Sequence, residues 1–306
     1  MKKLIIGRNG FVGKNLGEFF NDAHIIGSSE LNLLSETAVM DFFKNEYFDI
    51  VINTAVYNPR NEKNKEGSST EIELENDLRM FHNIARCHDL YGKMIYFGSG
   101  AEYDKRYPIC SVTEEDLIDS KSGSCSNLLP ESQYGLAKYI IGREIESGIY
   151  GADNIYNLRI FGLFGKYENW KSTFISGACC KAMKGIPITI RQNVFFDYLY
   201  INDFCEMIHR FIQIEKPKYH TYNITSGRRV SLTELAEIVN RVSGKDVPVI
   251  ICKDGLANEY TSSNQRLLSE IGDVDFTSFE DAIADLYGYY KSIEEDIDLY
   301  SLLYQA

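Results

Sequence analysis

The sequence has little of what marks membrane-spanning, secreted or nucleic-acid-binding proteins. None of its apolar runs approaches the roughly 20 residues that cross a bilayer, so we expect no membrane partner. The apolar stretch after Met1 is too short for a signal peptide, which favours a cytoplasmic protein. Lys and Arg number 32 against 44 Asp and Glu, and the formal charge of -12 disfavours nucleic acid because phosphate binding needs a basic field.

Cysteine patterns that hold metals or disulfides are also missing. The seven cysteines are odd in number and include no CxxC pair and no Cys/His cluster at ligand spacing, so we expect neither a disulfide framework nor a metal. Prolines number only six, and 44% of the 306 residues are apolar while 25% are charged. This balance is typical of a globular chain that is long enough to bury a sizeable core.

Short β-branched runs alternate with helical patterns, which is typical of βαβ units and a parallel sheet. We expect strands over residues 4–6, 24–27, 49–53, 93–97, 155–160 and 195–201. We expect helices over residues 14–20, 37–44, 72–89, 131–145 and 203–214. The predicted fold class is therefore α/β, with a doubly wound parallel sheet of the Rossmann type.

The C-terminal part is more mixed and predicts a smaller α/β lobe. Ser231 followed by Glu234 has the spacing of a capping box, so a helix should begin there. The dinucleotide-binding domain is predicted to span residues 1–165 with 195–225 returning to it, and the substrate-binding lobe residues 166–194 and 226–306. Two polar stretches, 58–69 and 119–127, have loop composition and follow strands, where ligands bind in open α/β sheets.

Gly7, Gly10 and Gly13 form GxxGxxG between the first predicted strand and the first predicted helix. Glycines let the backbone approach a pyrophosphate, which the helix amides and the positive end of the helix dipole hold. The spacing alone also fits an ordinary glycine-rich turn. The candidate cofactor contacts lie in this turn, at later strand ends and on the long helix: Gly7, Arg8, Asn9, Gly10, Phe11, Val12, Gly13, Ser28, Ser29, Asn53, Ala55, Asn76 and Lys138.

The end of the second predicted strand bears on the choice of cofactor. Gly27-Ser28-Ser29 places no Asp or Glu at the strand tip, where NAD-binding chains carry an acid for the adenosine ribose. Small hydroxyl residues with Arg8 nearby favour a 2′-phosphate, although Arg8 would equally fit a solvated surface position. NADP is therefore predicted, and NAD is the open alternative.

Tyr134 and Lys138 lie one helical turn apart on one helix face. A neighbouring ammonium lowers the pKa of a phenol, so Tyr134 would exchange a proton with an alcohol or a carbonyl near neutral pH. With 21 tyrosines in the chain, the spacing alone also fits a chance pair. The order of the motifs along the chain favours a catalytic pair over a chance pair, because Ser99 ends a predicted strand between the glycine turn and the Tyr134 helix.

These motifs together resemble the extended short-chain dehydrogenase/reductase (NAD-dependent epimerase/dehydratase) family of nucleotide-sugar enzymes. The similarity extends over almost the whole chain, through residues 98–103, 196–203, 222–224 and 231–236. Residues 30–34 and 39–43 are most similar to GDP-L-fucose synthase-like nucleotide-sugar reductases. The resemblance implies that Ser99 and Tyr134 hydrogen-bond a sugar keto oxygen, that Tyr134 donates the proton, and that Lys138 holds the nicotinamide ribose and tunes Tyr134.

Two positions depart from relatives that epimerise sugars. Strand alternation predicts that Ala101 faces the substrate with Ser99, where those relatives carry a cysteine, and that Glu102 points the other way. Thr173 lies near the place of a second catalytic histidine of those relatives. Neither alanine nor threonine serves as a general base, so we expect no epimerisation. Other bases left open are Glu102 turned inward, Cys110, Cys125, Lys166 and Glu168.

The family's arginine in the late strand motif is replaced by Phe196, so diphosphate contacts must come from elsewhere. Candidates are Arg191, Arg228 and Arg266, each of which also fits an ordinary surface arginine. The substrate-binding candidates are thus Ala101, Glu102, Thr173 and these three arginines.

The expected function is reduction of a 4-keto-deoxy sugar on a nucleoside diphosphate by a nicotinamide cofactor, without ring epimerisation. A nucleotide-sugar 4-epimerase with the same triad is the runner-up, and a non-catalytic dinucleotide-binding member of the family is a third alternative. The resemblance also implies a homodimer, in which an extra apolar stripe on the helices over 72–89 and 131–145 forms a four-helix bundle.

Overall fold

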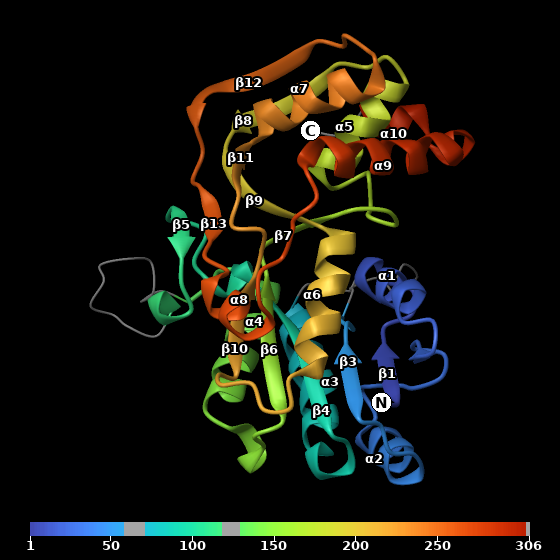
Figure 1. Cartoon of the computed structure of the whole chain (residues 1–306), viewed down its shortest axis with the longest axis vertical. Helices are drawn as coiled ribbons and strands as arrows, with labels where there is room; N and C mark the ends of the chain where they lie inside the picture. The colour runs from blue at the N-terminus through green and yellow to red at the C-terminus, as the bar shows by residue number, and fades with distance from the viewer. Residues whose placement is uncertain (58–70, 118–128, 304–306) are drawn as a thin grey trace.

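A six-stranded parallel sheet forms the centre of the molecule (Figure 1). The computed structural model describes residues 1–57, 71–117 and 129–303, so the predicted polar loops over 58–69 and 119–127 lie outside the described residues. The strand order is β10-β6-β4-β3-β1-β2. The strands are β1 (Lys3–Ile6), β2 (His24–Ile26), β3 (Ile50–Asn53), β4 (Lys93–Ser99), β6 (Ile155–Ile160) and β10 (Thr221–Ile224). The strand order reverses between β1 and β3, which confirms the doubly wound fold and places the ligand crevice beside the glycine turn.

Helices cover both faces of this sheet. The helices are α1 (Phe11–Phe19), α2 (Glu36–Asn45), α3 (Glu71–Ala85), α4 (Gln133–Glu146) and α6 (Ile201–Gln213). Alternating strand side chains enter two cores, so that Ile52 and Ile95 pack on the side of α1 and α6, whereas Val51 and Met94 pack on the side of α2, α3 and α4. Burial on both faces explains why the strands read as nearly continuous apolar runs.

A second, mixed sheet joins the two parts of the chain. Its order is β11-β9-β13-β5, and β7 also pairs with β9. The strands are β5 (Ile109–Val112), β7 (Gly162–Phe164), β9 (Phe195–Tyr200), β11 (Arg229–Ser231) and β13 (Tyr260–Ser262). β9 pairs both with β7, from the predicted dinucleotide-binding domain, and with β11 and β13 from the C-terminal segment. The sheet thus includes strands from both parts of the predicted division, whose boundaries stay a prediction.

The C-terminal lobe lies beyond the ends of the central strands (Figure 1). It contains the helices α5 (Phe174–Met183), α7 (Leu232–Ser243), α9 (Phe279–Ser292) and α10 (Leu299–Leu303). It also contains the paired strands β8 (Ile188–Asn193) and β12 (Val249–Leu256). The helix α8 (Gln265–Ile271) packs on α6 and β10. The predicted capping box begins α7, since Ser231 Oγ accepts from the Glu234 amide at 3.2 Å and Glu234 accepts from the Ser231 amide at 2.8 Å. None of the described helices is long and apolar enough to span a membrane.

Candidate active site

Ser99 lies where β4 ends and a short 3₁₀ turn (Gly100–Glu102) begins. Ser99 Oγ accepts a hydrogen bond from the Ala101 amide at 3.1 Å, and Glu102 Oε1 accepts from the Ser99 amide at 3.2 Å. These two bonds form a capping box that fixes the turn. Because the chain turns at Gly100, strand alternation does not extend to position 101, and Ala101 is buried rather than open to a substrate.

Glu102 points under the turn into the protein. Its side chain is fully buried beside that of Arg159 on β6, which is 2% exposed and donates from Nε to Glu102 Oε2. Asn157 Nδ2 also donates to Glu102 Oε1, at 3.2 Å. Both carboxylate oxygens are thus occupied away from the crevice. This orientation agrees with the prediction that Glu102 points away from the substrate, not with its place among the substrate-binding candidates, and it places the residue among the groups that hold Ser99.

The first turns of α4 bring Tyr134 and Lys138 to the end of β4. Ser132 caps the helix by accepting from the Gly135 amide at 3.0 Å. Tyr134 lies close enough to Ser99 for the serine to oppose the effect of burial on the pKa of its phenol. Lys138 Nζ donates to the Phe97 carbonyl at 2.6 Å and lies 5.7 Å from the centre of the Tyr134 ring. The structure therefore brings together the three residues to which the resemblance assigns the chemistry.

Burial dominates the ionisation of this pair. It raises the pKa of Tyr134, against the opposing effect of Ser99, and it lowers the pKa of Lys138 to about 8. The expectation that Lys138 lowers the pKa of Tyr134 is not met in this structure, where the ammonium is directed at the Phe97 carbonyl and lies 4.3 Å from the centre of the Tyr96 ring. A phenol that stays protonated at neutral pH is a proton donor rather than a base.

Asp77 on α3 is a site residue that the sequence analysis missed in favour of its neighbour Asn76. Its side chain is 6% exposed, and Oδ1 accepts from the Tyr57 amide at 2.7 Å. Oδ2 is buried and has no hydrogen-bond partner within the described part of the chain. The carboxylate acts electrostatically on Lys138 and on Tyr134, whereas Asn76 is half-buried. Helical spacing from the buried Phe81 would have indicated Asp77 as the inward residue.

Tyr260 of β13 also reaches the catalytic turn. Its side chain is 7% exposed and packs against the rings of Phe161 at 5.2 Å and Phe196 at 5.7 Å. The Tyr260 hydroxyl lies against Gly100 so closely that a Cβ at position 100 would collide with it. No local motif marks Tyr260 in the sequence, because only the second sheet brings β13 to the end of β4.

The glycine turn between β1 and α1 has the form of a dinucleotide cradle. Gly7 has a φ of +115°, and a Cβ on Gly13 would collide with the Gly7 carbonyl oxygen. Gly10 is the N-cap of α1 without a side-chain cap, and a Cβ there would meet only the Gly7 oxygen, at 3.5 Å. The bare first turn of α1 therefore fits a diphosphate. The unpartnered Asp77 oxygen beside Lys138 fits a polar group such as a ribose hydroxyl.

The other predicted cofactor residues frame this turn. Phe11 and Val12 are half-buried in the first turn of α1, and Asn9 is exposed. At the end of β3, Asn53 is buried and its side chain accepts from the Ala55 amide at 3.1 Å. The strand ends and the helix start thus meet as the motif predicts.

An acid does lie at the tip of β2, which corrects the interpretation of Gly27-Ser28-Ser29. A tight turn folds Glu30 back, so that its Oε2 accepts from the Gly27 amide at 3.0 Å and from Ser29 Oγ at 2.8 Å. Arg8 forms an ion pair with Glu30 and also donates to the Ile25 carbonyl. Ser28 is exposed. A 2′-phosphate at this place would have to compete with Glu30 for Arg8.

The three candidate arginines have different surroundings. Arg266 is held between Glu115 and Glu114, the latter at 3.5 Å, and donates to the Thr221 carbonyl at 3.1 Å. Two carboxylates neutralise its charge, which corrects the expectation that it binds a diphosphate. Arg191 is exposed on β8 in the two-stranded sheet of the lobe.

Arg228 remains the best-placed candidate for an anionic ligand. It lies 4.7 Å from the centre of the Phe279 ring and donates to the Thr277 carbonyl at 2.8 Å. Its buried Nε has no hydrogen-bond partner among the described residues. Thr173 is the N-cap residue of α5, and its hydroxyl donates to the Asn169 carbonyl at 3.1 Å.

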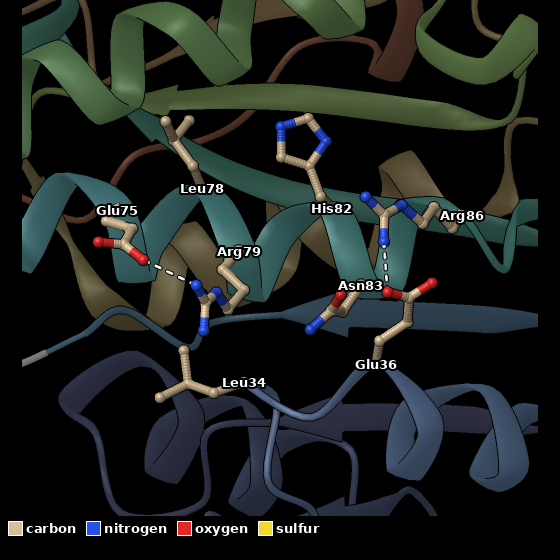
Figure 2. A pocket seen from close by; sticks show the side chains of 8 residues that line it. All are labelled: Leu34, Glu36, Glu75, Leu78, Arg79, His82, Asn83 and Arg86. Atoms are coloured by element: carbon tan, nitrogen blue, oxygen red, sulfur yellow. Dashed lines mark hydrogen bonds and ion pairs between the residues drawn. The ribbon is translucent and has the colours of Figure 1, made fainter.

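A groove of about 490 Å³ lies apart from these residues, on the outer side of α3 (Figure 2). Figure 2 shows two ion pairs among the residues that line it: Arg79 to Glu75 one turn away on α3, at 2.7 Å, and Arg86 to Glu36 of α2, at 2.9 Å. It contains none of the candidate site residues. The described residues contain no group of three or more His, Cys, Asp or Glu side chains that could hold a metal ion.

Comparison with known proteins places this site in a family. The NAD dependent epimerase/dehydratase family matches residues 3–225. No curated protein sequence matches significantly. Among solved structures, GDP-mannoheptose C4 reductase from Campylobacter jejuni, with NADP bound, has a TM-score of 0.73 and 22% identity over 95% of this chain and 98% of its own. A GDP-L-fucose synthetase from Naegleria fowleri has a TM-score of 0.76 and 17% identity, covering 96% of this chain and 93% of its own.

A third similar structure is RMD from Pseudomonas aeruginosa complexed with NADPH, with a TM-score of 0.73, 18% identity and coverage of 96% of this chain and 98% of its own. At these identities the similarity establishes the fold, while the family match spans most of the chain and includes the glycine turn, Ser99, Tyr134 and Lys138. The chain belongs to the NAD dependent epimerase/dehydratase family and has the architecture of its nucleotide-sugar enzymes.

Proposed function

We propose that this protein reduces the 4-keto group of a deoxy sugar carried on a nucleoside diphosphate, with NADP as cofactor and without epimerising the ring. The convergence of Ser99, Tyr134 and Lys138 at the end of β4 carries the proposal. The residues at 101 and 173 are alanine and threonine, which move no carbon-bound proton. Similar folds named as C4 reductases support this reaction class.

The residues have separate tasks in this reaction. Ser99 and Tyr134 hold the keto oxygen, and Tyr134 gives it a proton because burial raises the pKa of the phenol. Ser99 stabilises the negative charge that develops on that oxygen. The nicotinamide cofactor supplies the hydride. Lys138 and Asp77 hold the ribose, and Arg228 is the candidate anchor for the diphosphate.

A second candidate, an epimerising enzyme, is favoured by one observation. Burial raises the pKa of Glu168 to about 7, in the loop before α5, where its carboxyl group accepts a hydrogen bond from Ser176. A carboxyl group poised near neutral pH is suited to general base catalysis. Against this role, the Ser176 hydroxyl already donates to the Glu168 carboxylate, and Glu168 has no electrostatic effect on Tyr134 comparable with that of Asp77.

The decisive experiment is turnover in deuterated water. The protein is incubated with NADPH and with 4-keto-6-deoxy sugars of GDP, CDP, UDP and dTDP, and the products are analysed by NMR. We expect stoichiometric oxidation of NADPH and no deuterium at carbons 3 and 5. Deuterium at either carbon at the rate of turnover would establish epimerisation at that carbon, and interconversion of the C4 epimers of a 4-hydroxy nucleotide sugar without net change of the cofactor would establish a 4-epimerase. Tyr134→Phe is the inactive control, expected to lose about two to four orders of magnitude in turnover.

A further inference from the structure

A single buried carboxylate, that of Glu102, holds the backbone at Ser99. Its Oε1 accepts from the Ser99 amide and from Asn157 Nδ2, each at 3.2 Å, and its Oε2 accepts from Arg159 Nε. The Glu102 side chain is fully buried, and that of Arg159 is 2% exposed. One member of a buried ion pair is therefore bonded directly to the residue that the proposed function places against a keto oxygen.

Two glycines leave the space in which this carboxylate lies. A Cβ at Gly98 of β4 would come to 2.2 Å from Glu102 Oε1, and a Cβ at Gly142 of α4 would come to 2.6 Å from Glu102 Oε2. The carboxylate is thus enclosed between β4 and α4, which are the two elements that supply the catalytic groups.

The 3₁₀ turn after Ser99 also packs directly on α4. Gly135, the neighbour of Tyr134, has no room for a side chain, because a Cβ there would lie 2.7 Å from the Ala101 carbonyl oxygen. Ser99 Oγ accepts from the Ala101 amide at 3.1 Å, which fixes the direction of the hydroxyl oxygen and leaves its proton to be donated. The position of the turn therefore sets how Ser99 and Tyr134 face each other.

Stability alone does not explain why the Glu102–Arg159 pair is charged. Two charges lose their hydration when they are buried, and replacing such a pair with apolar residues of similar volume is often neutral or stabilising. What an apolar side chain at position 102 lacks is an acceptor for the Ser99 amide. The charged pair therefore fits a role in the geometry of the active site.

We propose that Glu102 is a positioning residue for the reduction, in that its Oε1 holds the Ser99 amide and thereby sets the Ser99 hydroxyl against the oxygen that Tyr134 protonates. Arg159 and Asn157 in turn hold Glu102. The inference rests on the proposed function, because it concerns the geometry of that reaction. A displacement of about 1 Å in a reacting group can cost about a hundredfold in rate, so one hydrogen bond to this backbone is enough to matter.

Two double variants separate geometry from stability. The first, Glu102→Leu with Arg159→Met, removes both charges and the acceptor oxygen. The second, Glu102→Gln with Arg159→Met, removes both charges but keeps an acceptor oxygen, which the Asn157 amide orients. We expect the first to lower kcat about ten- to a hundredfold with KM changed less than about threefold, and the second to keep kcat within about threefold of the wild type.

The kinetics are measured at a temperature at which circular dichroism shows each variant to be folded. A wild-type kcat in the first double variant would overturn the proposal. An equal loss of kcat in both double variants would also overturn it, because the acceptor oxygen would then not be what matters.

Glu114→Leu is the matched control for the loss of a buried carboxylate. Glu114 is 3% exposed, and its Oε1 accepts from the Asn223 amide of β10 at 2.6 Å rather than from the turn. Its neighbour Arg266 keeps Glu115 as an ion-pair partner in this variant. We expect kcat to stay within about twofold of the wild type. A loss as large as that of the first double variant would show that Glu102 acts only through stability.

Amide hydrogen exchange tests the same contact without turnover. Mass spectrometry of peptides that span residues 97–103 reports the exchange of the Ser99 and Ala101 amides. We expect faster exchange in the first double variant and wild-type protection in the second. Equal protection in all three proteins would overturn the inference. If the wild type reduces none of the 4-keto sugars, the proposed function fails, and the exchange result still decides whether Glu102 holds the turn.

Discussion

At the scale of single residues, burial sets which groups carry charge in the active site. Lys138 is buried under Tyr134 and Tyr96, and burial lowers its pKa to about 8, opposed by Asp77. Below this pKa the ammonium is charged, and above it the charge is lost. In the proposed reaction, a charged Lys138 would hold the ribose and would stabilise the phenolate that forms when Tyr134 gives up its proton.

We therefore predict that kcat/KM for the reduction is constant near neutral pH and falls as the pH rises through about 8. Lys138→Met should have low activity and should lack this descending limb. Initial rates of NADPH oxidation across pH 6 to 10 measure both. A wild-type profile that is flat to pH 10 would contradict the assignment.

The Arg8–Glu30 pair should control the choice between the two nicotinamide cofactors. Glu30 repels a 2′-phosphate and holds the arginine that would bind one. We expect Glu30→Gln to favour NADPH over NADH more strongly than the wild type does, and Arg8→Ala to shift preference toward NADH. The ratio of kcat/KM values for the two cofactors is the measurement. Glu46→Gln is the control, since its ion pair with Lys2 is remote from the turn.

At the scale of elements, the buried Glu102–Arg159 pair fastens the catalytic turn to β6. Removal of one partner leaves an uncompensated buried charge, which costs about 3 to 5 kcal/mol of unfolding free energy. We predict that Glu102→Leu and Arg159→Met each destabilise by this amount, and that the double variant recovers much of the loss. Urea denaturation measures the three values. A double variant as unstable as the sum of the single ones would contradict a coupled pair.

Glu168 links the loop before α5 to that helix and gives stability a pH dependence. Burial raises the pKa of this carboxyl to about 7 in the folded state, above its usual 4.5. The folded state therefore binds the proton more tightly, and the stabilisation is complete at low pH and is lost as the pH rises toward 7. We expect Glu168→Gln to abolish this loss, which amounts to roughly 1 to 3 kcal/mol of unfolding free energy above pH 7.

Thermal or chemical unfolding of Glu168→Gln and the wild type at pH 5 and pH 8 measures the difference. Glu206→Gln, which removes an exposed carboxylate paired with Arg210 at 2.8 Å, is the matched control and should leave the pH dependence unchanged. Equal stability of the Glu168 variant and the wild type at pH 8 would show that this carboxyl ionises freely.

At the scale of the whole molecule, the outer sides of α3 and α4 bear on the predicted dimer. Apolar side chains on these helices, such as Leu74 and Ile140, are half-buried, and the extra apolar stripe stays a prediction. The outer side of α3 also has the groove with its Arg79–Glu75 and Arg86–Glu36 pairs (Figure 2). Association through these helices would therefore depend on charge as well as on apolar contact.

We predict that the protein is a dimer in solution, and that Arg79→Glu together with Arg86→Glu shifts it toward the monomer. Light scattering at low and at high salt measures the mass. Arg241→Glu is the matched control, because Arg241 is exposed on α7 and pairs with Glu280 at 3.2 Å. A strictly monomeric wild type would rule out the four-helix bundle.

The fold and the meeting of the candidate site residues could be predicted from the sequence because their signals are local. Buried parallel strands read as apolar runs, the glycine turn follows from the space that a Cβ would need, and the Tyr134–Lys138 spacing places both residues on one helix face. The capping box at Ser231 has the same local origin. Within a strand or a helix, neighbours along the chain are neighbours in space, so periodicity alone assigns them.

What lies beside a functional group comes from distant segments, and this only the tertiary structure decided. Glu102 turned toward Arg159 of β6, Arg266 toward Glu114 and Glu115, and Tyr260 of β13 toward Gly100. Glu30 lies at the tip of β2 because a tight turn folds it back onto Gly27, and no periodic pattern in the sequence marks that turn. Each of these side chains goes where a buried charge or hydroxyl finds a partner, and that partner is set by how the sheets pack rather than by sequence spacing.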